Sequence, residues 1–229
     1  MIPVICIDGP SGVGKGTLSR HLAQKLGWHL LDSGAIYRAL GLAALEQGIL
    51  PDPNPDVAAL EELARALPLQ FREEGGQTRV FLQDRDISVA LRSPLAGQLA
   101  SQVAALSPVR NALLERQRHF RQAPGLVADG RDMGTVVFPD APLKVFLTAS
   151  VEERAQRRLK QLQEQGDSAS LRAVEAEIAE RDRRDRERSV APLLPAADAR
   201  ILDSSGQSVA ETFRVLEGWV HDTFGELIF

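Results

Sequence analysis

The sequence predicts an α/β fold built on a mostly parallel central sheet. Three observations predict it. Short, fully apolar runs recur along the chain, segments with helical periodicity lie between them, and several of these segments begin at recognisable helix caps. Strands that are buried on both faces read as continuous apolar runs, and their alternation with helices is typical of parallel sheets.

Five apolar runs have the length and composition of buried strands. They are Val4–Ile7, Trp28–Leu31, Leu126–Ala128, Leu143–Leu147 and Ala199–Leu202. A helix is predicted directly after the first run and the loop that follows it. Its apolar residues share one face at helical spacing: Leu18, Leu22, Ala23 and Leu26.

Four later helix starts carry capping signatures. Ser93–Pro94 and Ser107–Pro108 each place a capping hydroxyl before a first-turn proline. Ser150–Glu153 and Ser208–Glu211 have the spacing of capping boxes. We therefore expect helices to begin at these four places.

Two regions interrupt the alternation. The first, from about residue 49 to residue 92, opens with a proline-rich loop and continues with a helical pattern over Val57–Leu67. It closes with a hairpin-like pair around Glu74–Gln77, in which Val80 and Leu82 alternate on the returning strand. We expect a small α+β insertion here.

The second region, Glu152–Arg188, is highly charged and is interrupted at Gly166–Ser168. Two charged helices joined by a glycine-containing break fit a hinged lid. The same pattern fits a solvated helical hairpin held by ion pairs four residues apart, such as Arg181 with Asp185. Charge alone leaves both interpretations open.

Length and composition predict one soluble domain with a substantial core. The chain has 229 residues, 44% of them hydrophobic and 25% charged, and a net charge of −4. We expect a core of residues 1–38, 93–150 and 189–229, an insertion at 39–92 and a lid region at 151–188. All belong to a single domain.

The same composition argues against several classes of protein. Without a basic footprint we expect no nucleic-acid partner, and without an apolar stretch of about 20 residues we expect no membrane span. The first strand begins so early that no signal peptide is expected. The single cysteine, Cys6, cannot form an intrachain disulfide, and the four histidines lack metal-ligand spacing. These features predict a cytoplasmic monomer.

The segment between the first strand and the first helix is rich in glycine. It consists of Gly9, Pro10, Ser11, Gly12, Val13, Gly14, Lys15, Gly16 and Thr17. A strand, a glycine-rich loop and a helix in this order place backbone N–H groups and a helix N-terminus around an anion, and Lys15 adds a full positive charge. We expect this loop to bind a triphosphate.

Two other interpretations of the glycine-rich loop are a turn that binds nothing and a dinucleotide-binding loop. A glycine-rich turn that binds nothing would not need the lysine or the strand and helix on either side. A dinucleotide-binding loop would need a third glycine three places after Gly14, and Asp32 would only imitate its ribose-binding acid. Because Gly16 separates Lys15 from Thr17, the threonine hydroxyl is a less direct magnesium ligand than usual.

Polar clusters follow the predicted strands, where parallel sheets bind ligands. Residues 32–38 follow the second strand and residues 129–132 follow the third. Asp129 is placed to hold Mg²⁺ through water, together with Thr17. Further along the chain lie arginines and a carboxylate in the charged region: Arg154, Arg157, Arg158, Arg181, Asp185 and Arg188. The last three share one helical face, and converging guanidiniums of this kind suit phosphoryl transfer.

At these residues the chain closely resembles the bacterial cytidylate kinases of the nucleoside monophosphate kinase superfamily. The matching segments, which extend from about residue 4 to residue 205, are GPSGVGKGT, LLDSGAIYRAL, ASQVAALSPVR, ADGRDMGTVVFPDAP, ERDRRDRERSVAPL and ADARILDSS. The resemblance implies a three-layer P-loop kinase fold with an inserted α+β monophosphate-binding subdomain and a helical lid. It also implies that the Gly16-Thr17 arrangement is normal for the superfamily.

The resemblance further implies roles for individual residues. Residues 9–17 would bind the phosphates of ATP, and Arg154 and Arg158 would cover the donor base and the transferring phosphate. The acceptor would be held at its phosphate by Arg38 and Arg131, and at its ribose by Arg181 and Asp185. The cytosine would be surrounded by Ser33, Ser101, Arg110, Asp132 and Arg188, with Tyr37 in the same acceptor set.

The expected reaction transfers the γ-phosphoryl group of ATP to CMP or dCMP, with Lys15, Asp129, Arg131 and Arg158 as the catalytic residues and Mg²⁺ as the metal. One alternative is a kinase on the same fold for another small acceptor, such as UMP, another nucleotide or a hydroxy acid. The other is a nucleotide-binding switch that hydrolyses slowly, although the Asn-Lys-x-Asp sequence of guanine-reading switches is missing.

Overall fold

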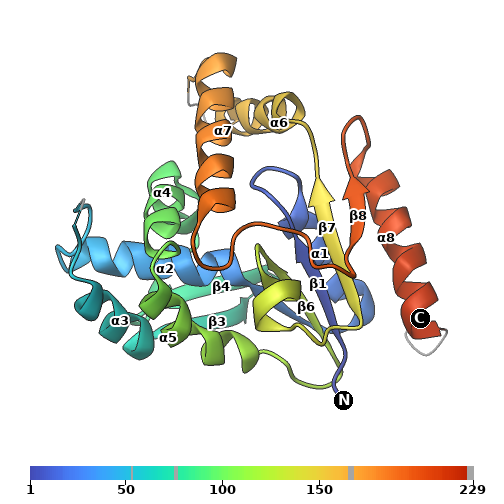
Figure 1. Ribbon diagram of the computed structural model, residues 1–229, viewed down its shortest axis with the longest axis horizontal. Helices are drawn as coiled ribbons and strands as arrows, with labels where there is room; N and C mark the ends of the chain where they lie inside the picture. The colour runs from blue at the N-terminus through green and yellow to red at the C-terminus, as the bar shows by residue number, and fades with distance from the viewer. Residues whose placement is uncertain (53, 75–76, 165–167, 226–229) are drawn as a thin grey trace. The chain divides into compact units, whose positions relative to one another are not determined.

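The computed structural model describes residues 1–52, 54–74, 77–164 and 168–225 (Figure 1). Its contacts divide the chain into two compact units. The first unit comprises residues 1–31 and 118–229, and the second comprises residues 32–117. The second unit is wider than the insertion expected at 39–92. The finer division into core, insertion and lid stays a prediction.

A five-stranded sheet forms the centre of the first unit (Figure 1). Its strands lie in the order β2 (His29–Asp32), β6 (Leu126–Gly130), β1 (Val4–Asp8), β7 (Leu143–Thr148) and β8 (Arg200–Asp203). β1 pairs in parallel with both β6 and β7, and β7 pairs in parallel with β8. All five apolar runs are therefore strands, and the predicted α/β fold with a mostly parallel sheet is confirmed.

Two helices pack on one face of this sheet. They are α1 (Lys15–Leu26) and α8 (Val209–Phe224). Leu22 of α1 and Leu216 of α8 join a buried cluster with Ile5 and Val145 of the strands. Contact between apolar side chains of helix and strand holds the turn between β1 and α1 in place, because both of its ends are anchored in the core.

The charged region forms two packed helices, α6 (Val151–Glu164) and α7 (Leu171–Glu187). Each turns a few apolar side chains toward the other, and these make a small buried cluster of their own: Ala155, Leu162, Val174 and Ile178. The predicted pair of charged helices is confirmed. Gly166 and Asp167 of the predicted break lie outside the described residues.

Two of the four predicted caps are confirmed. Ser93 accepts a hydrogen bond from the backbone N–H of Ala96 at the start of α4 (Pro94–Val103). Ser208 and Glu211 form a complete capping box at the start of α8. In each case the serine and its partner are three residues apart, so local sequence alone could specify them.

The other two caps differ from the prediction. The Ser150 hydroxyl accepts from the N–H of Glu153, but the N–H of Ser150 donates to the hydroxyl of Ser205, so only half of the box forms. Ser107 is not a cap, because α5 (Ser107–Arg118) already includes it. The first helical hydrogen bond runs from the N–H of Arg110 to the carbonyl of Leu106, which starts the helix one residue early.

The second unit combines helices with a small antiparallel sheet. Its remaining elements are α2 (Ser33–Glu46), α3 (Val57–Ala66), β3 (Leu69–Glu74), β4 (Gln77–Leu82), β5 (Arg85–Asp86) and the short helix η1 (Ala90–Arg92). α2 and α4 approach closely where Gly41 faces Leu99, since a Cβ on Gly41 would lie 2.7 Å from the Cβ of Leu99. This contact packs α2 directly against α4.

The hairpin of the second unit follows the prediction in part. β3 and β4 pair antiparallel from Leu69–Leu82 onward, as expected, while residues 75 and 76 of the turn lie outside the described residues. Strict alternation on the returning strand is wrong, because Phe81 is buried as well as Val80. The guanidinium of Arg72 lies 4.2 Å from the centre of the Phe81 ring and covers it.

Within the described residues, no helix is long and apolar enough to cross a membrane.

Candidate functional site

The glycine-rich loop leaves β1 in direct contact with β7. Gly9 has φ +149°, and a Cβ built on it would lie 2.0 Å from the carbonyl oxygen of Leu147. Only glycine allows the backbone to pass this close to a neighbouring strand in this conformation. The position of the whole loop therefore depends on Gly9.

Gly9→Ala is expected to destabilise the protein by more than about 3 kcal/mol, because the methyl group overlaps the Leu147 carbonyl and the backbone is strained. Urea unfolding measures this loss. Gly14→Ala is the matched control: Gly14 has φ +97° but nothing within 4 Å of its Cβ position. Gly14→Ala would strain the backbone without a steric overlap, and it should lower the free energy of unfolding by about 1–2 kcal/mol. Equal losses for the two variants would contradict the close approach of Gly9 to β7.

Lys15, the first residue of α1, turns back over the loop. Its ammonium group donates to the carbonyl of Pro10 at 2.9 Å and lies 4.0 Å from Oδ1 of Asp129. Burial lowers the pKa of Lys15 to about 7, and Arg131 acts in the same direction, against the opposing effect of Asp129 and Asp8. A phosphate bound in the loop would restore the full charge on this lysine.

Asp8, the last residue of β1, was not among the predicted site residues. Its buried carboxylate accepts the backbone N–H groups of Met133 at 2.9 Å and Gly134 at 2.8 Å. Burial raises the pKa of Asp8 to about 7, although these two hydrogen bonds lower it. The carboxylate ties the start of the loop to the segment that follows Arg131. The sequence signal that could have identified Asp8 is its position as a charged residue at the end of an apolar strand.

Asp129 and Thr17 are the residues expected to hold a metal. A Cβ on Gly16 would lie 3.4 Å from Oδ2 of Asp129, so the carboxylate faces the first turn of α1. The side chain of Thr17 is exposed in that same turn. No group of three or more histidine, cysteine, aspartate or glutamate side chains capable of holding a metal occurs among the described residues. A cation here would therefore need ligands from a bound phosphate or from water.

Arg131 and the predicted helical face of α7 come together. Nε of Arg131 donates to Oδ2 of Asp185 at 3.1 Å, and the Asp185 side chain is buried. Burial raises the pKa of Asp185, but Arg131, Arg188 and Arg181 together outweigh it and hold that pKa below its usual value. Three guanidiniums thus act on the Asp185 carboxylate, and the i, i+4, i+7 spacing predicted Arg181 and Arg188 near it but not Arg131.

Arg154 lies beside the loop and is almost completely buried. Its guanidinium makes a two-pronged ion pair with Asp182 of α7, at 3.0 and 2.6 Å, and also donates to the carbonyls of Ser11 and Ala149. These bonds connect the loop, the end of β7 and α7. The expected contact of Arg154 with the donor nucleotide stays a prediction.

The next two arginines of α6 behave differently from Arg154 and from one another. Arg157 donates to the carbonyl and hydroxyl of Ser204, which follows β8, and to the carbonyl of Val13 in the loop. Arg158 is half-buried, and its guanidinium makes no hydrogen bond or ion pair with the part of the chain that the structure describes. Arg158 is therefore the arginine of α6 that keeps its donors available for a ligand.

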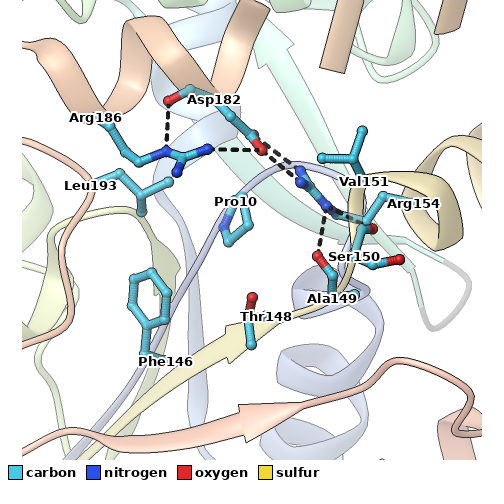
Figure 2. A pocket seen from close by; sticks show the side chains of 10 residues that line it. All are labelled: Pro10, Phe146, Thr148, Ala149, Ser150, Val151, Arg154, Asp182, Arg186 and Leu193. Carbon is cyan, nitrogen blue, oxygen red and sulfur yellow. Dashed lines mark hydrogen bonds and ion pairs between the residues drawn. The ribbon is translucent and has the colours of Figure 1, made fainter. Parts of the chain in front are cut away.

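A cavity of about 290 Å³ adjoins the Arg154–Asp182 pair (Figure 2). Its walls combine apolar, hydroxyl and charged side chains from the loop, β7, α6, α7 and the segment after α7. They are Pro10, Phe146, Thr148, Ala149, Ser150, Val151, Arg154, Asp182, Arg186 and Leu193.

The second unit contains the other predicted acceptor residues. Arg38 donates to the carbonyl of Leu91 at 2.8 Å, and the hydroxyl of Ser33 donates to Oε1 of Gln117 at 2.7 Å. The buried guanidinium of Arg110 lies 5.6 Å from the centre of the Tyr37 ring. This arrangement brings polar groups of α2 and α5 together inside the unit.

Two other predicted acceptor residues stand apart from these contacts. Ser101 is half-buried on α4 in the second unit. Asp132 belongs to the first unit, where it is buried directly before the short helix Met133–Val137.

Four residues of these contacts were absent from the prediction: Asp8, Asp182, Gln117 and Ser204. Asp182 lies in a run of alternating charges where every residue suits a solvated helix, and Gln117 is an ordinary polar residue of a helical segment. Nothing in the local sequence distinguishes Asp182 or Gln117, because their partners are distant in the chain.

Comparison with known proteins identifies the family of this chain. Residues 5–220 match the model of the cytidylate kinase family. The cytidylate kinase of Nitrosococcus oceani is 57% identical over 221 residues, covering 96% of each chain. That of Aeromonas hydrophila is 53% identical and covers 99% of this chain and 97% of its own. That of Sodalis glossinidius is 58% identical over 91% of each chain. The chain belongs to the cytidylate kinase family.

Proposed function

We propose that this protein transfers the γ-phosphoryl group of ATP to CMP and dCMP, which yields ADP with CDP or dCDP. Family membership supports the reaction. The observation that carries it is the gathering of Lys15, Asp129, Arg131 and Asp185 beside the glycine-rich loop. The positive charges of Lys15 and Arg131 reduce the repulsion between ATP and CMP, two polyanions that must be brought into contact for the reaction.

The donor is bound by the loop. Backbone N–H groups of residues 9–17 and the start of α1 hold the phosphates of ATP, and Lys15 neutralises the β- and γ-phosphates. Arg158, whose guanidinium N–H groups are available for a ligand, contacts the transferring phosphoryl group. Arg154 is also assigned to the donor site, although Asp182 holds its guanidinium.

The acceptor attacks with a phosphate oxygen. No general base is needed, because the second pKa of a phosphate monoester is about 6 and the nucleophile is already anionic at neutral pH. The oxygen forms a bond to the γ-phosphorus as the bond to the β-bridging oxygen breaks, and ADP leaves with those electrons. Lys15 and Arg131 meet the charge that spreads over the migrating group.

Acceptor recognition is divided among three parts of CMP. Arg131 and Arg38 hold the phosphate, while Arg181 and Asp185 bind the ribose. Cytosine is recognised by polar residues, Ser33, Ser101, Arg110, Asp132 and Arg188, with Tyr37 in the same acceptor set.

The residues at the loop fit Mg²⁺. One carboxylate, Asp129, and one exposed hydroxyl, Thr17, suit an ion that takes its other ligands from phosphates and water, which is how Mg²⁺ is usually held in kinases. When bound, the ion neutralises phosphate charge. Asp129 would hold the ion through water, with Thr17 beside it.

A coupled assay of ADP release with and without CMP tests the proposal. We expect release to depend on CMP and on dCMP, and to be slow with ATP alone. Equal release without an acceptor would favour a nucleotide-binding switch. Faster release with UMP or another acceptor than with CMP would favour a kinase of different specificity.

Arg188→Met is expected to reduce the preference for CMP over UMP by about tenfold, because one charged hydrogen bond to the base is lost. The ratio of kcat/KM for the two acceptors measures it. Arg183→Met is the control, since Arg183 is exposed on the same helix and paired with Glu180 and Glu187. A uniform loss on both acceptors would assign Arg188 to the phosphate instead.

The proposal includes a monomer that acts in the cytoplasm without nucleic acid. The net charge of −4 supports the absence of a nucleic-acid surface. Light scattering at assay concentrations tests the oligomeric state, and a mass of twice 25.0 kDa would contradict it.

A further inference from the structure

Asp182 lies on α7 directly after Arg181, and its side chain faces Arg154 of α6. Its carboxylate receives both terminal nitrogens of Arg154, at 3.0 and 2.6 Å. The two side chains are only 3% and 4% exposed. A buried, two-pronged pair has one geometry, so it sets the distance and the orientation between the two helices that carry it.

The Arg154 end of this pair is anchored in the loop. Nη1 of Arg154 donates to the carbonyl of Ser11, and Nε donates to the carbonyls of Ala149 and Ser150. Gly12 has φ +82°, and a Cβ there would lie 3.3 Å from the Cβ of Arg154, so the loop packs tightly against α6 at this point. A single guanidinium thus contacts the loop, the end of β7 and α7.

The geometry points to Asp182 as a positioning residue that fixes α7 to the loop through Arg154. Arg181 and Asp185 lie within one turn of Asp182 on α7, and Arg188 follows the end of this helix, so the pair sets where these acceptor residues stand relative to the bound donor. This inference rests on the proposed function for its effect on catalysis. Its structural part, the attachment of α7 to the loop, does not.

The surroundings make the pair necessary for this attachment. The cavity of about 290 Å³ borders both Arg154 and Asp182, so side-chain packing does not fill the space beside them (Figure 2). Among the described residues, α7 also shares with α6 a small buried apolar cluster of four residues. Loss of the carboxylate would leave a buried guanidinium without its partner and α7 without a directional link to the loop.

The test compares Asp182→Asn, Asp182→Glu, Arg154→Met and the double variant Arg154→Met/Asp182→Leu. Arg186→Gln is the matched control, because Arg186 lies 3.8 Å from the same carboxylate but its side chain is 62% exposed. Hydrogen exchange of the α7 amides, melting temperature, and kcat and KM for ATP and CMP are measured for each variant.

We expect Asp182→Asn to raise KM for CMP by about tenfold and to speed exchange along α7, since small misplacements of binding groups have large kinetic effects. Asp182→Glu should recover part of the loss, because it keeps the charge and the cavity accommodates a further methylene. The double variant should regain melting temperature, as no unpaired charge remains, but should keep the raised KM. Arg186→Gln should resemble the wild type.

Two results would overturn the inference. The first is unchanged α7 exchange in Asp182→Asn. The second is a double variant that regains both melting temperature and KM for CMP, which would leave the pair only a packing role. If the wild type fails to phosphorylate CMP, the proposed function is wrong, and α7 exchange still decides the inference.

Discussion

Replacing Lys15 with methionine is expected to lower kcat about 10³-fold or more while the fold stays intact. Lys15 is the buried cation of the loop, hydrogen-bonded to the carbonyl of Pro10 and 4.0 Å from Asp129. Methionine has nearly the same length but no charge, so the backbone N–H groups of the loop would remain and the charge facing the γ-phosphate would not. The coupled ADP-release assay measures the loss.

The fold should tolerate Lys15→Met because the lysine is held in an unfavourable environment. Burial lowers its pKa to about 7, which shows that the charged form is poorly solvated there. An apolar side chain of similar volume should leave the melting temperature at or above that of the wild type.

Lys25→Met serves as the control for this variant. It lies on the same helix, is 47% exposed, and pairs with Glu217 of α8 far from the loop. Near-normal turnover in Lys15→Met would remove the lysine from the catalytic residues. An equal loss of turnover in Lys25→Met would show that α1 itself had been disturbed.

Arg131→Met is expected to lower kcat/KM for CMP about 10³-fold, because a guanidinium that meets phosphate charge is lost from the acceptor side. ATP affinity should change much less, since the loop that binds the donor is untouched. Steady-state kinetics with each substrate varied in turn separate the two effects.

Arg131→Lys gives a finer test of the same residue. Lysine keeps the charge but not the planar fork that reaches both Asp185 and a phosphate, so we expect a loss intermediate between wild type and Arg131→Met. Arg200→Met, an exposed site on β8 paired with Asp222, should be neutral. A raised KM for ATP with an unchanged KM for CMP would place Arg131 on the donor side instead.

The elements that could be predicted from the sequence are those specified by neighbouring residues. Each strand of the five-stranded sheet lies within two residues of its predicted ends. The inner strands β1, β6 and β7 are largely buried, as continuous apolar runs predict, whereas the edge strands β2 and β8 bury one residue each. The Ser208 box formed as predicted, since both partners lie within one turn. The Ser150 box failed where Ser205, 55 residues away, took the N–H.

The helical face of Arg181, Asp185 and Arg188 was also predictable, since a helix places residues four and seven apart on one side. The partner of that face was not. Asp185 meets Arg131, which follows β6 and lies 54 residues earlier in the chain, and only the tertiary fold brings them together.

The sequence by itself therefore determined the parallel sheet, the glycine-rich loop and the family. Only the tertiary structure decided which buried charges hold the site together. Asp8 accepts a hydrogen bond from a backbone N–H 125 residues away, and Asp182 pairs with Arg154, 28 residues away. The physical reason is that periodicity and backbone sterics act over a few residues, whereas a buried charge must be satisfied by whichever segment folds against it.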